Sequence, residues 1–116
     1  RQRQMCIETA LAVSIGTAHG EYKGTPHLNF ERLQEIAAEV SVPLVLHGGS
    51  GSGDENLSKA VELGICKVNI CTDLLNAARD NTKDGYAERS YYDSVTLAKD
   101  GIKDCLKHYY EVFHTK

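Results

Sequence analysis

The sequence contains no tryptophan, one methionine and two prolines, and none of its hydrophobic runs approaches the ~20 residues of a membrane-spanning helix. Lys and Arg number 13 against 16 Asp and Glu, so the net charge is −3. This balance predicts no basic surface for nucleic acid or for anionic lipid. The apolar fraction of 41% over 116 residues is ordinary for a soluble globular chain. We therefore expect neither a membrane protein nor a nucleic-acid-binding protein.

The four cysteines are too few and too widely spaced for a secreted disulfide framework. They are Cys6, Cys66, Cys71 and Cys105, and none forms a CxxC pair. No signal peptide is recognisable. The sequence therefore predicts reduced thiols, three of them packed, in a cytoplasmic protein.

Three short apolar runs predict β-strands at residues 11–15, 43–46 and 66–70. Each run is rich in Val, Ile or Leu and too short for a helix. Their nearly continuous hydrophobicity is typical of parallel strands that are covered on both faces.

Helical patterns lie between and after these runs. An apolar stripe over 30–40 follows Asn29 as N-cap, and a second helix is expected between Asp54 as N-cap and Gly64 as stop. A third helix opens at Thr72, and a long final one spans about 92–113, with 81–85 as the most loop-like stretch before it. Alternating strands and helices predict βαβ crossovers and a parallel sheet. A small doubly wound sheet and a piece of an eight-stranded β/α barrel both fit this order.

In both folds, ligands bind beyond the carboxyl ends of the strands, where two histidines are found. His19 and His47 each follow a strand next to a glycine, and two imidazoles at one rim suit a divalent ion such as zinc. A catalytic zinc needs a third protein ligand, for which His27, His108 and His114 are poor candidates.

The same rim carries groups that suit a phosphate. Residues 48–51 (GGSG) resemble an anion cradle of backbone N–H groups with the Ser50 hydroxyl, and 69–72 lead into a helix N-terminus. Lys23 adds positive charge, whereas Asp73 is explained by stabilisation of the helix dipole. Tyrosine pairs at 91–92 and 109–110 are expected to pack the last helix against a neighbour, with a second subunit as one candidate. Together these features predict a phosphorylated small molecule beside a metal.

Three ordered motifs carry a family resemblance. Residues 12–20 (AVSIGTAHG) with 22–24 (YKG), 42–51 (VPLVLHGGSG) and 64–70 (GICKVNI) resemble class II ketose-bisphosphate aldolases, in particular the fructose- and tagatose-bisphosphate branch. The resemblance implies an α/β fold: the C-terminal portion of a (β/α)8 TIM barrel, with the last three β/α units and the terminal helix. Residues 1–116 would then be part of one barrel domain.

The resemblance also implies site residues. His19 and His47 would be two of three ligands of Zn²⁺, and the carbonyls of Ala18, Gly20 and Gly48 would neighbour a monovalent cation, Na⁺ or K⁺. The residues expected to bind the sugar phosphate are Gly20, Lys23, Gly48, Gly49, Ser50, Asn69, Ile70, Cys71 and Thr72.

The implied activity is reversible aldol cleavage of fructose or tagatose 1,6-bisphosphate to dihydroxyacetone phosphate and glyceraldehyde 3-phosphate. Zinc would act as a Lewis acid. A whole barrel takes ~250 residues, so we expect the acid/base residues and the remaining zinc ligand upstream of this chain, which alone would be inactive. The full-length protein would be a homo-oligomer, dimeric or tetrameric.

Two other functions stay open. One is a non-catalytic aldolase-like subunit or sugar-phosphate-binding module, although two aligned histidines argue against a pure scaffold. The other is a small doubly wound phosphate-binding domain, complete at this length.

Overall fold

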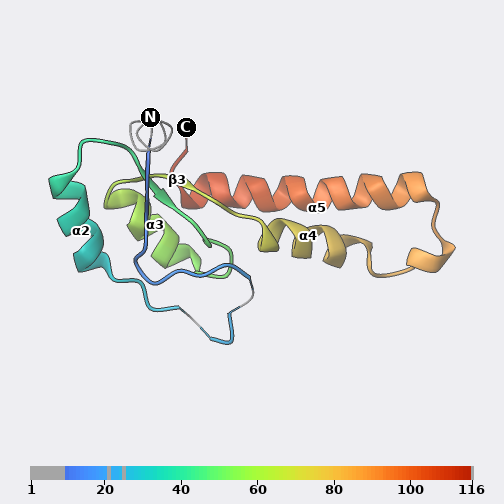
Figure 1. Cartoon of the computed structure of the whole chain (residues 1–116). Coiled ribbons are helices and arrows are strands. Elements are labelled where there is room, and N and C mark those ends of the chain that lie inside the picture. Colours follow the sequence, from blue (N-terminus) through green and yellow to red (C-terminus); the bar gives the residue numbers. More distant parts are fainter. Residues whose placement is uncertain (1–9, 21, 25, 116) are drawn as a thin grey trace, which may run out of the picture. The chain divides into compact units, whose positions relative to one another are not determined.

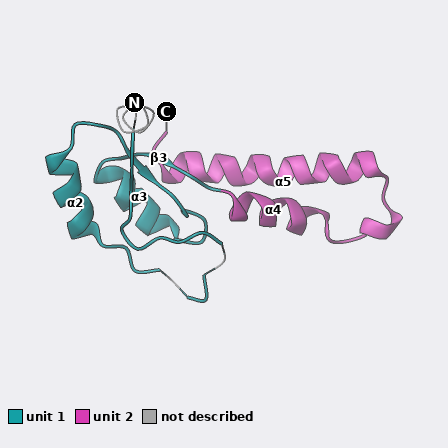
Figure 2. Ribbon diagram, in the orientation of Figure 1, with its two compact units in different colours: residues 1–70 teal, residues 71–116 magenta. Residues whose placement is uncertain are grey.

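The chain divides into two compact units, residues 1–70 and 71–116 (Figure 2). The computed structural model describes residues 10–20, 22–24 and 26–115, so Cys6 lies outside the described residues. Within the described ranges no helix is both long and apolar enough to cross a membrane. The expectation that residues 1–116 belong to one barrel domain stays a prediction.

Three parallel strands form the sheet of the first unit, in the order β1-β2-β3. They are β1 (Leu11–Val13), β2 (Leu44–Leu46) and β3 (Ile65–Val68). All three residues of β2 are buried, because this strand lies between the other two. The predicted strands and their parallel pairing are confirmed, although each observed strand is shorter and β3 begins one residue earlier than expected.

The helix α2 (Phe30–Glu39) begins where the sequence predicts. The side chain of Asn29 accepts a hydrogen bond from the backbone N–H of Arg32 at 2.9 Å, which satisfies one of the free donors of the first turn. Leu33, a residue of this helix, is fully buried. The stripe over 30–40 is thus confirmed as the inward face, with Leu33 at its centre.

The helix α3 (Asp54–Glu62) begins one residue away from the prediction. Gly53 is the N-cap and makes no side-chain cap bond, so the expected capping role of Asp54 is wrong. Asp54 and Glu55 instead lie in the first turn, where the positive end of the helix dipole interacts favourably with their carboxylates and stabilises the helix. Gly64 follows the helix with φ +109°, as expected of a residue that stops it.

Two antiparallel helices form the second unit (Figure 1). They are α4 (Thr72–Thr82) and α5 (Tyr91–Val112), with the 3-10 turn η1 (Tyr86–Glu88) between them. The expectation of a loop from residue 81 is wrong at 81–82, where α4 continues and the side chain of Asn81 donates to the Leu97 carbonyl at 2.7 Å. The helices approach closely at Gly101, where a Cβ would lie 2.5 Å from the carbonyl oxygen of Ala77.

A buried tyrosine joins the two helices of the second unit. The hydroxyl of Tyr109 donates a hydrogen bond to the carboxylate of Asp73 in the first turn of α4, and its ring stacks on Phe113 with centroids 5.4 Å apart. Tyr109 is 7% exposed and both of these contacts lie within the second unit, whereas Tyr110 is 56% exposed. Asp73 therefore has a specific partner beyond the helix dipole. The packing of the exposed tyrosines against a neighbour stays a prediction.

The expectation that three of the four cysteines are packed is wrong. Among the cysteines that the structure describes, Cys66 and Cys71 are exposed and Cys105 is half-buried. Cys66 lies on β3, which has a neighbour on one side only among the described strands, and Cys71 precedes α4. Burial, together with the nearby Asp73 carboxylate, raises the pKa of the Cys105 thiol.

Replacing Leu33 with alanine should lower the free energy of unfolding by about 2–5 kcal/mol, because a fully buried side chain leaves a cavity. Urea unfolding measures the change. Leu75→Ala is the matched control, since Leu75 is 62% exposed. An equal loss in both variants would contradict the assignment of Leu33 to the core.

Cys105 should react with a disulfide reagent more slowly than Cys66 and Cys71. Its raised thiol pKa leaves less thiolate at pH 8, and its side chain is less accessible. Mass spectrometry of peptides after timed labelling gives the rate at each cysteine. Labelling of Cys105 at the same rate as the two exposed thiols would argue against this burial.

Candidate functional site

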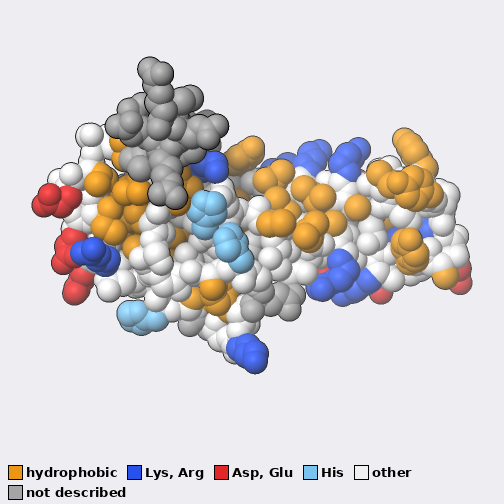
Figure 3. All heavy atoms as spheres, viewed as in Figure 1, with side chains coloured by type: hydrophobic (Ala, Val, Ile, Leu, Met, Phe, Trp, Pro, Cys, Tyr) orange, Lys and Arg blue, Asp and Glu red, His pale blue; other side chains and the backbone are white. Residues whose placement is uncertain are grey.

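Two histidines lie side by side at the ends of neighbouring strands. His47 directly follows β2, and His19 lies on the loop after β1. Their ring centroids are 5.7 Å apart and the ring planes are inclined by 74°. Both side chains are exposed, and Figure 3 shows two neighbouring histidine side chains at the surface. The structure thus brings together the two residues that the sequence predicts as metal ligands.

A hydrogen bond from Asn69 holds the ring of His47. The Nδ2 atom of Asn69 lies 3.0 Å from Nδ1 and 3.4 Å from Nε2 of that imidazole. Lys67 Nζ donates to the Asn69 side-chain oxygen at 2.7 Å, which leaves the amide NH2 group to face the histidine. Since NH2 only donates, the ring nitrogen must accept. Asn69, expected only to bind substrate, therefore also orients a candidate ligand.

The glycines after β2 are required by close packing. Gly48 has φ +66°, and a Cβ there would lie 2.3 Å from the carbonyl oxygen of Ala18. A Cβ at Gly49 would lie 2.6 Å from Cγ1 of Val68, while the Gly49 N–H donates to the Asn69 carbonyl at 3.1 Å. The glycine loop is therefore packed between the loop after β1 and the end of β3.

Tyr22 is a residue of this site that sequence reasoning missed. Its hydroxyl accepts a hydrogen bond from the Ala18 N–H at 2.7 Å and lies 2.8 Å from the Ala18 carbonyl oxygen and 3.0 Å from that of Gly48. The available signal was its position in the motif 22–24, next to Lys23. The carbonyls of Ala18 and Gly48, expected near a monovalent cation, thus converge on a tyrosine hydroxyl.

The other predicted residues differ in their surroundings. Ser50 is 5% exposed within the glycine loop, whereas Gly20 and Lys23 are exposed on the loop after β1. Ile70 is half-buried after β3 and ends the first unit. The second unit begins with two more of them, namely Cys71, the N-cap of α4 without a side-chain cap bond, and Thr72, the first helical residue.

A small cavity of about 220 Å³ lies beside the histidine pair. It is lined by His19, His47, Ala18, Thr17 and the β1 residues Ala12 and Val13, with Ser14 next to them. The pair therefore borders a space at the strand ends instead of packing into the core.

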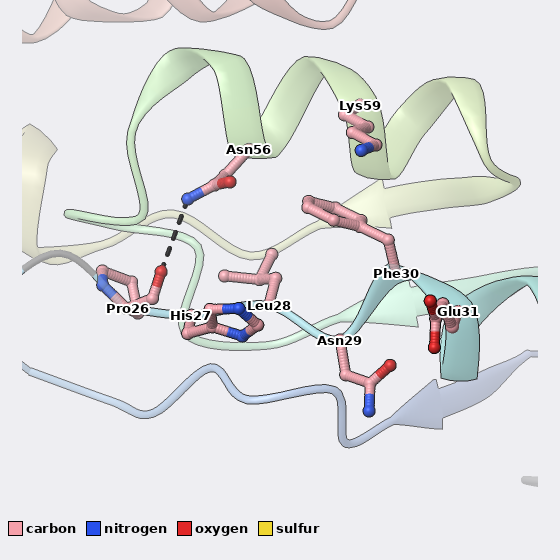
Figure 4. Close-up of a pocket in the computed structure, with 8 residues that line it drawn as sticks. All are labelled: Pro26, His27, Leu28, Asn29, Phe30, Glu31, Asn56 and Lys59. Atoms are coloured by element: carbon pink, nitrogen blue, oxygen red, sulfur yellow. Dashed lines mark hydrogen bonds between the residues drawn. The ribbon is translucent and has the colours of Figure 1, made fainter.

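A larger cavity of about 640 Å³ lies elsewhere in the first unit, between the start of α2 and α3 (Figure 4). Lys59 Nζ lies 4.5 Å from the ring centroid of Phe30, and the Asn56 side chain donates to the Pro26 carbonyl at 3.5 Å. None of the predicted site residues lines this cavity. His27, judged a poor metal ligand from the sequence, lies here.

The histidine pair fits two positions of a zinc site. Rings whose centres are 5.7 Å apart are compatible with metal–nitrogen bonds of about 2.0–2.1 Å to one shared ion. Imidazole nitrogen is a preferred zinc ligand. The bond from Asn69 limits the orientation of the His47 ring, although its direction is opposite to the usual support of a zinc ligand, in which the ring donates its other N–H. Among the described residues no group of three or more His, Cys, Asp or Glu side chains is placed to hold a metal.

Comparisons with known proteins support the fold. The chain superposes on the YdjI aldolase of Escherichia coli K12 with a TM-score of 0.82 and 37% identity, over 90% of this chain and 39% of that one. For a putative fructose-1,6-bisphosphate aldolase of Coccidioides immitis the TM-score is 0.84 with 25% identity, over 91% and 38%. A fructose-bisphosphate aldolase of Campylobacter jejuni shares the fold, with a TM-score of 0.63 and 23% identity, over 90% and 39%.

These matches confirm the expected fold class, an α/β portion of a TIM barrel. The chain spans no more than 39% of the length of these three solved proteins. The sequence of residues 4–116 matches the family described as fructose-bisphosphate aldolase class-II. Because this match covers nearly the whole chain, the protein belongs to the class-II fructose-bisphosphate aldolase family.

Proposed function

We propose that the polypeptide carrying this chain is a zinc-dependent aldolase. Its reaction would be the reversible cleavage of a ketose 1,6-bisphosphate, fructose or tagatose, to dihydroxyacetone phosphate and glyceraldehyde 3-phosphate. The observation that carries the proposal is the edge-to-face pair of His19 and His47, 5.7 Å between ring centres, in a chain of this family.

The proposal assigns His19 and His47 as two protein ligands of the metal. A bound zinc ion supplies Lewis-acid polarisation of a carbonyl oxygen. Neutral imidazole is the form that binds zinc, and in a neutral ring the nitrogen that accepts from the Asn69 amide is the one that carries the lone pair, so zinc would take the place of the Asn69 amide at that nitrogen. Lys67 keeps that amide in place through its bond to the Asn69 oxygen. These residues therefore bind and orient, and the proposal places the acid/base groups outside this chain.

The glycine loop after β2 would hold a phosphate of the substrate. Gly48 and Gly49 leave no room for side chains of their own, and Ser50 adds a hydroxyl. The N–H groups of Gly49 and Ser52 already donate to Asn69 and Gly49 carbonyls, so the cradle would rely on other donors of the loop. The contributions of Gly20, Lys23, Ile70, Cys71 and Thr72, and the monovalent cation, stay predictions.

His47→Ala should lower zinc affinity by more than about 100-fold and abolish cleavage of both bisphosphates, because it removes a metal ligand. The measurement is zinc content after dialysis, together with release of dihydroxyacetone phosphate, in the polypeptide that carries this chain. His27→Ala is the matched control, an exposed histidine outside the histidine pair. Full activity of His47→Ala, or cleavage that needs no metal, would contradict the proposal.

A zinc-free wild-type protein that still bound dihydroxyacetone phosphate would instead support the non-catalytic sugar-phosphate-binding module. Calorimetric titration with this phosphate after chelation distinguishes the two functions.

The 116-residue chain alone should be inactive and bind zinc weakly. Its described residues supply two clustered histidines, whereas a catalytic zinc takes three protein ligands. Zinc titration and an aldolase assay on the purified chain test this expectation. Turnover comparable to that of the longer polypeptide would show that a third ligand is not required from outside.

A further inference from the structure

The loops that carry the two histidines meet at a single side-chain oxygen. The Tyr22 hydroxyl lies within hydrogen-bond distance of the backbone of Ala18, directly before His19, and of the carbonyl of Gly48, directly after His47. Each contacted residue is therefore one peptide bond away from a candidate metal ligand. A shift at this oxygen would be passed directly to the spacing of the two imidazoles.

The donor and acceptor count shows which of these bonds joins the loops. A phenol has one proton to donate and an oxygen that accepts. It accepts from the Ala18 N–H at 2.7 Å, and its proton is shared between the carbonyls of Ala18 at 2.8 Å and Gly48 at 3.0 Å. The two Ala18 bonds are local to the loop, spanning four residues. Only the Gly48 bond spans 26 residues and crosses to the other histidine loop.

Packing limits where this hydroxyl can go. A Cβ added to Gly51 would lie 3.1 Å from Cδ2 of the Tyr22 ring, so the ring lies against the glycine loop. The loops themselves are in contact, since a Cβ at Gly48 would lie 2.3 Å from the Ala18 oxygen. The half-buried ring thus presents its hydroxyl at the contact between the loops.

We propose that Tyr22 is a positioning residue for the metal site. Its hydroxyl holds the loops of His19 and His47 at the spacing that lets both imidazoles bind one divalent ion, and it thereby sets metal affinity. The inference rests on the proposed function for the identity of the two ligands. Tyr22 acts through the backbone of its neighbours and touches neither histidine ring in any contact described above.

The test compares Tyr22→Phe with wild type in the polypeptide that carries this chain. Phenylalanine keeps the ring against Gly51 and removes only the bridging hydroxyl. Zinc affinity, measured by competition with a chromophoric chelator, should fall by about 10–100-fold, as is typical when a group that supports metal ligands is lost. The absorption bands of the Co²⁺-substituted protein should weaken or shift, because the two imidazoles no longer share a fixed geometry.

Ser52→Ala is the matched control. The Ser52 hydroxyl donates to the same Gly48 carbonyl, at 3.3 Å, but lies on the same loop as that carbonyl and forms no bridge. Zinc affinity and the Co²⁺ spectrum of Ser52→Ala should remain those of wild type. All titrations are made with tetramethylammonium as the only monovalent cation, so that Na⁺ or K⁺ cannot take the place of the hydroxyl between the carbonyls.

Wild-type zinc affinity in folded Tyr22→Phe would overturn the inference, and so would an equal loss in Ser52→Ala. If Tyr22→Phe does not fold, Gly51→Ala replaces it, since the added methyl group would lie 3.1 Å from the ring and push it by a few tenths of an ångström while the hydroxyl is kept. Gly53→Ala, at a similar positive φ with nothing within 4 Å of the added Cβ, is the control for backbone strain and should bind zinc as wild type does. Weaker zinc binding by folded Gly51→Ala is expected, and unchanged binding would overturn the inference. Failure of the proposed function gives a different result. In that case wild type binds no zinc, or His47→Ala binds zinc as tightly as wild type.

Discussion

The close contact between the loops after β1 and β2 is the constraint on which the candidate site depends. At Gly48 the backbone has φ +66° and approaches Ala18 so closely that no Cβ could be accommodated. A larger residue would push apart the two loops that carry His19 and His47. The contact is therefore sterically demanding, and a hydroxyl from Tyr22 completes it. Parallel pairing of β1 with β2 brings the loops to the same edge.

Polar bonds then order the groups around this contact. Lys67 holds the Asn69 amide and Asn69 holds the His47 ring, so a side chain on β3 influences a candidate ligand after β2. In the second unit, the bond from Tyr109 to Asp73 joins the last turns of α5 to the first turn of α4. That turn begins with Thr72, one of the predicted substrate-binding residues. Each unit thus uses tyrosine to fix a position next to predicted site residues.

The sequence predicts the elements well because local rules determine them. Hydrophobic runs mark the three strands, Asn29 caps α2, and Gly64 stops α3. The two histidines expected after neighbouring strands also lie side by side, since parallel strands bring their carboxyl ends together, and their role as metal ligands stays a prediction. The errors arise where spacing does not determine contacts. Asp54 fits the capping pattern, yet the chain turns at Gly53 with φ +84° and shifts the helix start by one residue.

Long-range pairing explains the residues that were missed. Tyr22 contacts Gly48 across 26 residues and Tyr109 contacts Asp73 across 36, and no periodicity encodes such pairs. The sequence predicts that Gly48 and Gly49 let backbone N–H groups approach a phosphate. In the structure both positions need glycine because neighbouring loops pack too closely for a side chain.

X-ray absorption on the zinc-loaded polypeptide tests the central claim most directly, with His47→Ala for comparison. The account predicts imidazole nitrogen at about 2.0–2.1 Å from zinc, with one fewer such ligand in the variant. An identical imidazole signal in both proteins would contradict it.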